Sequence, residues 1–170
     1  MPVTTSRTSG GCAILLIAAL TISCTRGITP LERQVYATVL AGYVALAPDS
    51  LMVSSIADTI PGGTRIELVA PELRTAFGEA QRSAETLAQK TLAANALDPL
   101  PVRIVSQADA GEGRHVLHLS RIGFNSDSTR AVVYVEDRCS ALCGEAHLHL
   151  LGRLPNGRWE QVQDVLLWVS

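Results

Sequence analysis

Two cysteines and two histidines near the carboxyl end of the chain have the residue types of a metal site. Cys139 and Cys143 are four positions apart, and His147 and His149 follow at alternate positions. Residues two apart in a strand lie on one face, so both imidazoles would point the same way. Two thiolates and two imidazoles can hold a tetrahedral zinc ion. Their spacing matches no standard zinc finger, however, and they are weak metal candidates.

A structural disulfide between Cys139 and Cys143 is the favoured alternative. Thiols in an oxidising compartment tend to become oxidised, and these two form an even number once the N-terminal cysteines are set aside. By the chain-entropy argument so short a loop stabilises the fold by only about 2 kcal/mol, and its main effect is to fix the shape of the turn. We therefore predict a disulfide, with no metal and no other cofactor.

His149 also has a possible catalytic partner. If Asn156-Gly157 is the turn of the last hairpin, His149 lies opposite Asp164, and a carboxylate that orients an imidazole is half of a catalytic triad. Ser120 is the nearby serine to consider, but it lies in mid-strand, and the chain has no Gly-x-Ser-x-Gly motif. We therefore assign no catalytic residue, and a cross-strand pair on the solvated face is the simpler interpretation.

The elements that must position these residues begin with that hairpin. With Asn156-Gly157 as a two-residue loop, Leu154 faces Trp159 and the strands continue outward from that pair. Trp159 and the valines that follow it recur at intervals of three. A β-bulge near Gln161–Asp164 would reconcile this spacing with a strand, and a helix is the competing interpretation.

A second pair of strands precedes the hairpin. His115–Phe124 and Thr129–Glu136 are predicted strands, and the continuous apolar run Ala131–Val135 is typical of a strand buried on both faces. Asp137–Glu145 is predicted to link this pair to the last hairpin, with both cysteines in the link.

The first half of the chain predicts helices and shorter strands. Thr29, Pro30 and Glu32 form a capping box that starts a helix running to about Ala45. The further predicted elements are a strand over Leu51–Ile60, a short strand over Arg65–Val69, a helix over Glu72–Ala94 and a strand over Val102–Ser106. The expected fold is α+β: a C-terminal antiparallel β-meander of about four strands, plus one or two earlier strands, with its inner face covered by two amphipathic helices.

The N-terminus is typical of an export signal. Ala13–Ile22 is apolar but too short to cross a membrane core of about 30 Å as a helix. Leu20–Cys24 resembles a bacterial lipobox, with Thr21 where that pattern prefers leucine. We predict a signal peptide over 1–23, lipidation of Cys24, a tether over 24–28 and a single α+β domain over 29–170. Ordinary cleavage and an uncleaved anchor are the alternatives.

Composition limits the possible partners. A chain of 170 residues with 47% hydrophobic residues is the size of one domain with a core. A net charge of −2, 4% aromatic residues and the lack of a basic stripe argue against nucleic-acid binding.

Five motifs in the last third of the chain resemble a group of small exported bacterial proteins of uncharacterised function. The motifs are Leu119–Asp127, Ala131–Glu136, Cys139–Gly144, Asn156–Trp159 and Trp168–Ser170. In that group a glycine follows the first cysteine and aromatic residues often follow Cys-Gly, whereas this chain has Ser140 and Ala146-His147 there. The resemblance implies a common fold and compartment, and no activity.

Together these observations predict an uncharacterised cell-envelope lipoprotein that is exported, held at the outer membrane by its N-terminal lipid and faces the periplasm. Thr25, rather than aspartate, after the lipidated cysteine favours the outer membrane. The domain would bind an envelope protein or a small ligand, or act as an accessory, without catalysis. The alternative is a periplasmic hydrolase or metal-dependent enzyme that uses His147, His149, Asp164 and the two cysteines.

Overall fold

The computed structural model describes residues 27–47, 51–60, 66–106, 108–109, 114–140 and 143–170. Its helices are α1 (Pro30–Leu46) and α2 (Pro71–Thr86), and a 3₁₀ turn spans Ile66–Leu68. A mixed sheet has seven strands, which are β1 (Met52–Ser54), β4 (Arg103–Val105), β5 (Val116–Leu119), β6 (Gly123–Phe124), β7 (Arg130–Ser140), β8 (Cys143–Arg153) and β9 (Trp159–Val169). The strands β2 (Ile56–Ala57) and β3 (Lys90–Thr91) form a separate antiparallel pair.

The order of the large sheet is β4-β1-β5-β7-β8-β9, and β6 also pairs with β7. β1 is parallel to both β4 and β5, whereas the remaining pairs are antiparallel. The α+β class is confirmed, and β5, β7, β8 and β9 form an antiparallel series as predicted. The two parallel pairs and the separate strand β6 were not predicted.

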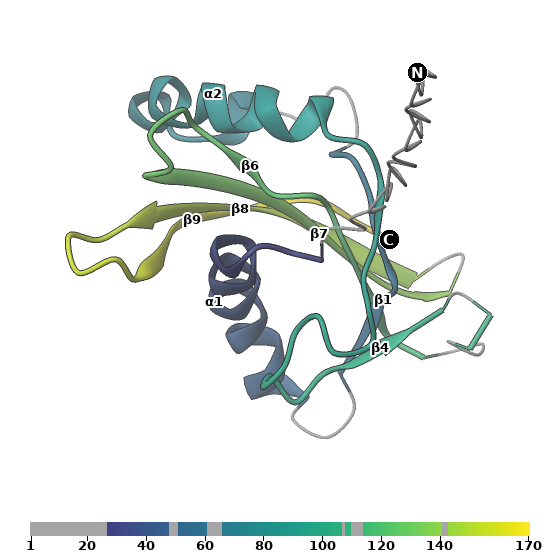
Figure 1. Ribbon diagram of the computed structural model, residues 1–170. Coiled ribbons are helices and arrows are strands. Elements are labelled where there is room, and N and C mark those ends of the chain that lie inside the picture. The colour runs from purple at the N-terminus through teal and green to yellow at the C-terminus, as the bar shows by residue number, and fades with distance from the viewer. Residues whose placement is uncertain (1–26, 48–50, 61–65, 107, 110–113, 141–142) are drawn as a thin grey trace, which may run out of the picture.

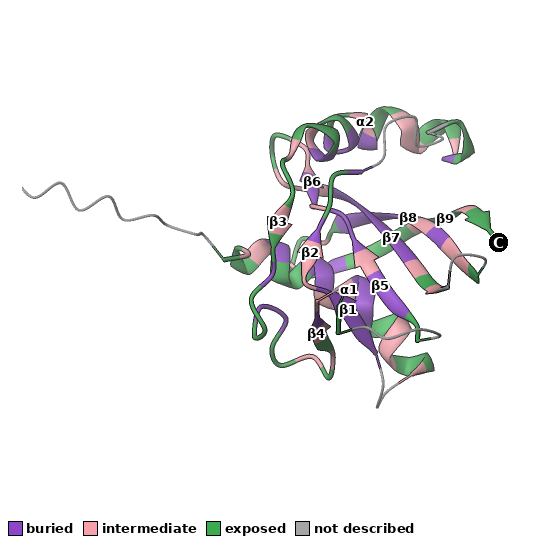
Figure 2. Ribbon diagram, turned by 90° about the vertical axis from the view of Figure 1, so that its right-hand side faces the viewer, coloured by how far each residue is buried: buried purple, intermediate pink, exposed green. Residues whose placement is uncertain are grey.

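Strand β7 lies in the middle of the sheet because both of its faces are apolar. Every residue of the run Ala131–Val135 is buried, as its continuous apolar sequence predicts. Val133 and Val135 belong to one core cluster, and Val132 and Tyr134 belong to another on the opposite face. Buried residues accordingly concentrate in the sheet, whereas the outer side of α2 is exposed (Figure 2).

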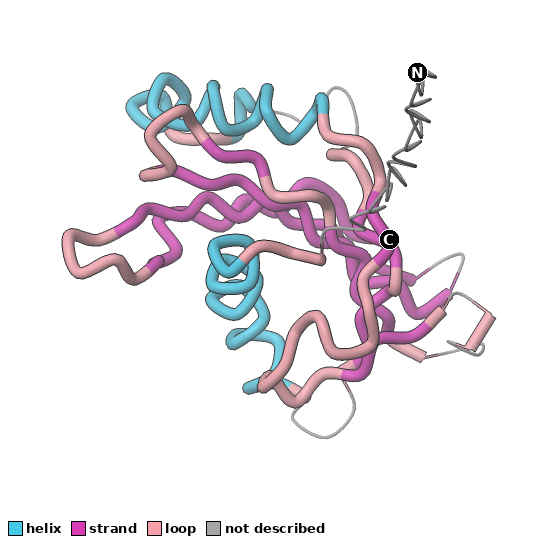
Figure 3. The backbone as a smooth tube through the Cα atoms, viewed as in Figure 1, coloured by secondary structure: helices cyan, strands magenta, loops and turns pink. Residues whose placement is uncertain are grey.

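The two helices lie on opposite sides of the sheet (Figure 1), and the long strands run between them (Figure 3). Val35 of α1 belongs to the cluster that contains Leu151, and Phe77 of α2 belongs to the cluster that contains Leu148. The sequence pattern predicted that both helices cover one inner face. The structure separates them because β7 and β8 carry apolar side chains on both faces, so each face has its own core.

The start of α1 is as predicted. Thr29 Oγ1 accepts a hydrogen bond from the Glu32 amide at 3.1 Å, and Glu32 Oε2 accepts one from the Thr29 amide at 2.7 Å. This reciprocal pair is a capping box, and it fixes the first turn of the helix.

Three predicted elements of the first half are wrong in extent or type. The stretch Leu51–Ile60 forms two short strands, and a 3₁₀ turn replaces the described part of the strand predicted at 65–69. Helix α2 ends at Thr86 instead of near Ala94. The extended chain after it brings Leu92 into the core beside α1, and this burial outweighs the helix propensity of the nearby alanines.

The last hairpin is extended, with a longer loop than predicted. Arg153, not Leu154, pairs with Trp159, and the Leu154 amide donates to the Arg158 carbonyl oxygen at 2.8 Å to close the loop. A register shift between Leu150 and Leu151 then leaves Val162 unpaired. The predicted β-bulge is therefore present, and it restores the predicted pairing of His149 with Asp164.

None of the helices within the described residues is long and apolar enough to cross a membrane.

Candidate functional site

A polar cluster lies on the α1 side of strands β8 and β9. His147 and His149 share this face, and their rings stack with centroids 5.8 Å apart. His147 Nδ1 lies 2.9 Å from Asp164 Oδ1, and His147 Nε2 lies 3.5 Å from Glu145 Oε1. The cluster therefore sets one imidazole between two carboxylates, with a second imidazole beneath the helix.

His149 is the buried member of the cluster, and it uses both ring nitrogens. Nδ1 lies 3.0 Å from Gln161 Oε1, and Nε2 lies 3.1 Å from the Tyr43 hydroxyl of α1. Asp164 Oδ1 is 3.7 Å from His149 Nδ1, which is too far for a hydrogen bond. Asp164 is thus across from His149 as predicted, but its close partner is His147.

Gln161 and Tyr43 were not predicted as members of this cluster. Gln161 reaches His149 only because the bulge at Val162 shifts the register of β9. Tyr43 comes from the apolar stripe of α1, more than a hundred residues earlier in the chain. The stripe indicated that the helix packs against something, but no local pattern indicated which strand residue its hydroxyl meets.

Burial favours the neutral forms of His149 and Tyr43. It lowers the pKa of His149 below its usual range, although the charge of Asp164 and the hydrogen bond of Gln161 act in the opposite direction. It also raises the pKa of Tyr43, helped by the charges of Asp164 and Glu145. A neutral imidazole with its proton on Nδ1 can donate to Gln161 and accept from the Tyr43 hydroxyl on Nε2.

We expect the fold to lose stability as the pH falls below about 6.5, the ordinary pKa of histidine. Burial lowers the pKa of both His149 and His118. Between the lowered folded-state pKa and the unfolded value, the unfolded chain binds more protons, so acidification favours unfolding. Thermal melting between about pH 7.5 and about pH 5.5 should show this decline. It should be flatter in a His118→Gln/His149→Gln variant, and an equal decline in that variant would contradict the assignment.

The cysteines form a disulfide. Cys139 and Cys143, at the facing ends of β7 and β8, are bonded with their Cα atoms 5.4 Å apart, as the sequence predicts. The strands extend farther than predicted, so the disulfide connects β7 to β8 at the end of their hairpin. The prediction placed it in a separate link over 137–145. With both sulfurs bonded, neither is a free thiolate for zinc. Within the described residues, no three histidine, cysteine or acidic side chains are grouped to hold a metal ion.

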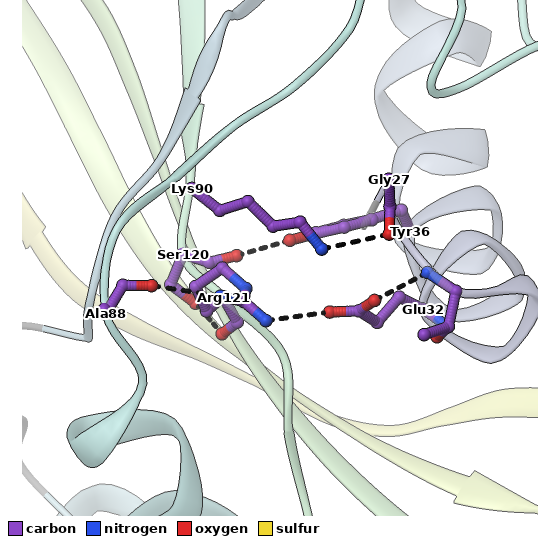
Figure 4. Close-up of polar contacts among 8 residues, drawn as sticks. Gly27, Glu32, Tyr36, Ala88, Lys90, Ser120 and Arg121 are labelled. Carbon is purple, nitrogen blue, oxygen red and sulfur yellow. Dashed lines mark hydrogen bonds and ion pairs between the residues drawn. The ribbon is translucent and has the colours of Figure 1, made fainter. Parts of the chain in front are cut away.

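Ser120 is buried, and its hydroxyl is hydrogen-bonded to the backbone. Its side chain is fully buried, and its hydroxyl donates to the Arg121 carbonyl oxygen at 2.8 Å while accepting from the Tyr134 amide at 2.9 Å. Its own carbonyl oxygen accepts from the Tyr36 hydroxyl of α1 at 2.8 Å (Figure 4). These contacts leave the hydroxyl no imidazole partner, so it is not placed as a nucleophile.

A hollow of about 240 Å³ lies on the other face of the sheet, between Asp58 and the polar ends of β5 and β7. Its buried carboxylate, Glu136, accepts from the Tyr134 hydroxyl at 3.2 Å and pairs with the Arg138 guanidinium. The one buried carboxylate in the lining is therefore already paired with its neighbours.

Comparisons with protein-family models, with curated proteins and with solved structures give no match.

Proposed function

We propose that this chain is an exported cell-envelope lipoprotein whose α+β domain binds another envelope molecule without catalysing a reaction. The apolar stretch Ala13–Ile22 and the lipobox-like Leu20–Cys24 support export and lipidation at Cys24. These residues lie outside those that the structure describes. Lipid on Cys24 would hold the domain at the outer membrane, facing the periplasm.

The hydrogen bonds of His149 are the observation that supports the non-catalytic part of the proposal. A general base needs one ring nitrogen free for its substrate or nucleophile. Both nitrogens of His149 instead join Gln161 of β9 to Tyr43 of α1. The contacts that could have been catalytic therefore hold the helix against the sheet.

The motifs of the family resemblance also fit structural positions. Gly123 lies against α2, Asn125 closes the turn before β7 by accepting from the Thr129 and Arg130 amides, and Trp159 packs against Phe124 in the core. A resemblance carried by such residues supports a common fold and need not imply a common reaction.

A periplasmic hydrolase or metal-dependent enzyme is the second candidate. The close contact between His147 and Asp164 favours it, because a carboxylate can orient an imidazole for proton transfer. Within the described residues, however, neither a serine nor a free cysteine is hydrogen-bonded to His147.

Intact mass of the mature protein, purified from membranes, tests the proposal. We expect the mass of residues 24–170 plus a lipid, and a gain of two hydrogen atoms on reduction of the disulfide. A Cys24→Ser variant should lose the lipid. A mature chain that begins elsewhere without lipid would overturn the lipoprotein proposal, and a zinc adduct in the native mass would favour the enzyme.

A further inference from the structure

A groove of about 690 Å³ runs between α1 and the last hairpin, and we name it the α1–hairpin groove. Its volume falls in the range of known ligand sites. Its lining residues are Gln34, Ala37, Thr38 and Ala41 of α1, and Arg153, Asn156, Gly157, Arg158 and Trp159 of the hairpin. It lies apart from the histidine cluster, with which it shares no lining residue.

The groove carries positive charge without a counterion from the fold. Arg153 and Arg158 are both exposed, and among the described residues neither forms an ion pair with a carboxylate. Arg153 Nε donates to the Gly157 carbonyl oxygen at 3.3 Å, which holds the guanidinium over the turn. Two guanidinium groups at one hairpin end are complementary to carboxylates, which they can bind in a bidentate manner.

The shape of the groove fits an extended chain better than a single compact anion. The helical wall from Gln34 to Ala41 is about 10 Å long at 1.5 Å per residue. Extended polypeptide rises about 3.3 Å per residue, so this wall matches about three residues. Ala37, Ala41 and Gly157 leave room for a main chain to approach, and the amide of Gln34 can bond to it.

Trp159 gives the groove an apolar floor. Its side chain is 6% exposed, and its indole Nε1 is buried without a hydrogen-bond partner in the described structure. A ligand in the groove would therefore lie over the indole and change its surroundings.

We propose that the α1–hairpin groove binds an extended acidic segment of a partner protein in the envelope, with Arg153 and Arg158 paired to its carboxylates. This inference rests on the proposed binding function and names the chemistry of the partner. The remaining groove residues, which are small or uncharged, select an extended main chain over a folded surface.

Trp159 fluorescence tests the proposal in the full-length mature chain. A Trp168→Phe background leaves Trp159 as the one tryptophan, and the probe is a synthetic peptide of alternating glutamate and alanine. We expect saturable binding that Arg153→Ala/Arg158→Ala weakens about tenfold or more through lost charge-assisted hydrogen bonds. Ala41→Leu should weaken it comparably, because it fills the groove and leaves both arginines in place.

The matched control is Arg103→Ala/Arg114→Ala, which removes the same charge from exposed positions outside the groove. It should bind the peptide as the parent does, and a lysine–alanine peptide should not bind. Binding that survives both groove variants would overturn the proposal. So would a failure of the peptide to bind while inorganic phosphate or short-chain phosphatidylglycerol binds through the same arginines. Lipidation is read from mass and affinity from fluorescence, so the two proposals can fail separately.

Discussion

Replacing Gly123 by alanine should lower the free energy of unfolding by about 3 kcal/mol, at the upper end of the usual cost of overpacking. Helix α2 crosses β6 so closely that an added Cβ would overlap the Ala80 carbonyl oxygen and lie 2.5 Å from the Ala84 amide nitrogen. These atoms belong to the helix backbone and cannot rotate away. The whole of α2 must move off the sheet, which opens the core around Phe77.

The alanines opposite Gly123 explain why the contact is so short. Ala80 and Ala84 are four residues apart, so they lie on one face of α2, and both are fully buried. Small side chains on the helix and none on the strand allow the two backbones to meet. The glycine of the motif Leu119–Asp127 is therefore required by packing.

Gly42→Ala is the matched control for this prediction. Gly42 lies inside α1, and a Cβ there would meet nothing within 4 Å. The substitution should be stabilising by about 0.5–1 kcal/mol, because alanine loses less backbone entropy in a helix. Urea denaturation followed by circular dichroism measures both variants. An unchanged unfolding midpoint for Gly123→Ala would show that α2 does not pack on β6 at this distance.

The sequence predicted those parts of the fold that depend on nearby residues. The capping box at Thr29, the buried run Ala131–Val135 and the bulge in β9 each follow from a local pattern, and each is present. The parallel pairing of β1 with β4 and β5 is different, because its partners lie some fifty residues or more away. Three-residue strands carry too little pattern to identify a distant neighbour.

The sequence predicted which side chains of the candidate site share a face of the sheet, but it did not predict their hydrogen-bond partners. Alternation placed His147 and His149 together, and the turn placed Asp164 opposite His149. Asp164 contacts His147 and not His149 because of the side-chain geometry across the bulge. The hydrogen bond between Tyr43 and His149 depends on how α1 lies on the sheet. Such contacts arise from tertiary packing, so a single sequence does not specify them.

Replacing Arg121 by methionine should cost about 3 kcal/mol, because it leaves the Glu32 carboxylate buried without its cation. Arg121 Nη2 lies 3.2 Å from Glu32 Oε1, and both side chains are largely hidden from solvent (Figure 4). Arg121 Nη1 also donates to the Ala88 carbonyl oxygen at 3.0 Å. The guanidinium thus joins the first turn of α1 to the chain after β5 and to the segment after α2.

A comparison of Arg121→Met with a double variant separates this charge effect from lost packing. In Glu32→Gln/Arg121→Met the buried charge is gone, so the double variant should be more stable than Arg121→Met alone by about 1 kcal/mol or more. Arg33→Met, on the same helix and exposed, is the control and should change stability by less than about 0.5 kcal/mol. Equal stability of Arg121→Met and the double variant would mean that solvent reaches Glu32 once the arginine is removed. The contribution of Arg121 would then be its packing and its bond to Ala88, and α1 would be held to the sheet by apolar contacts and the Tyr36 hydroxyl.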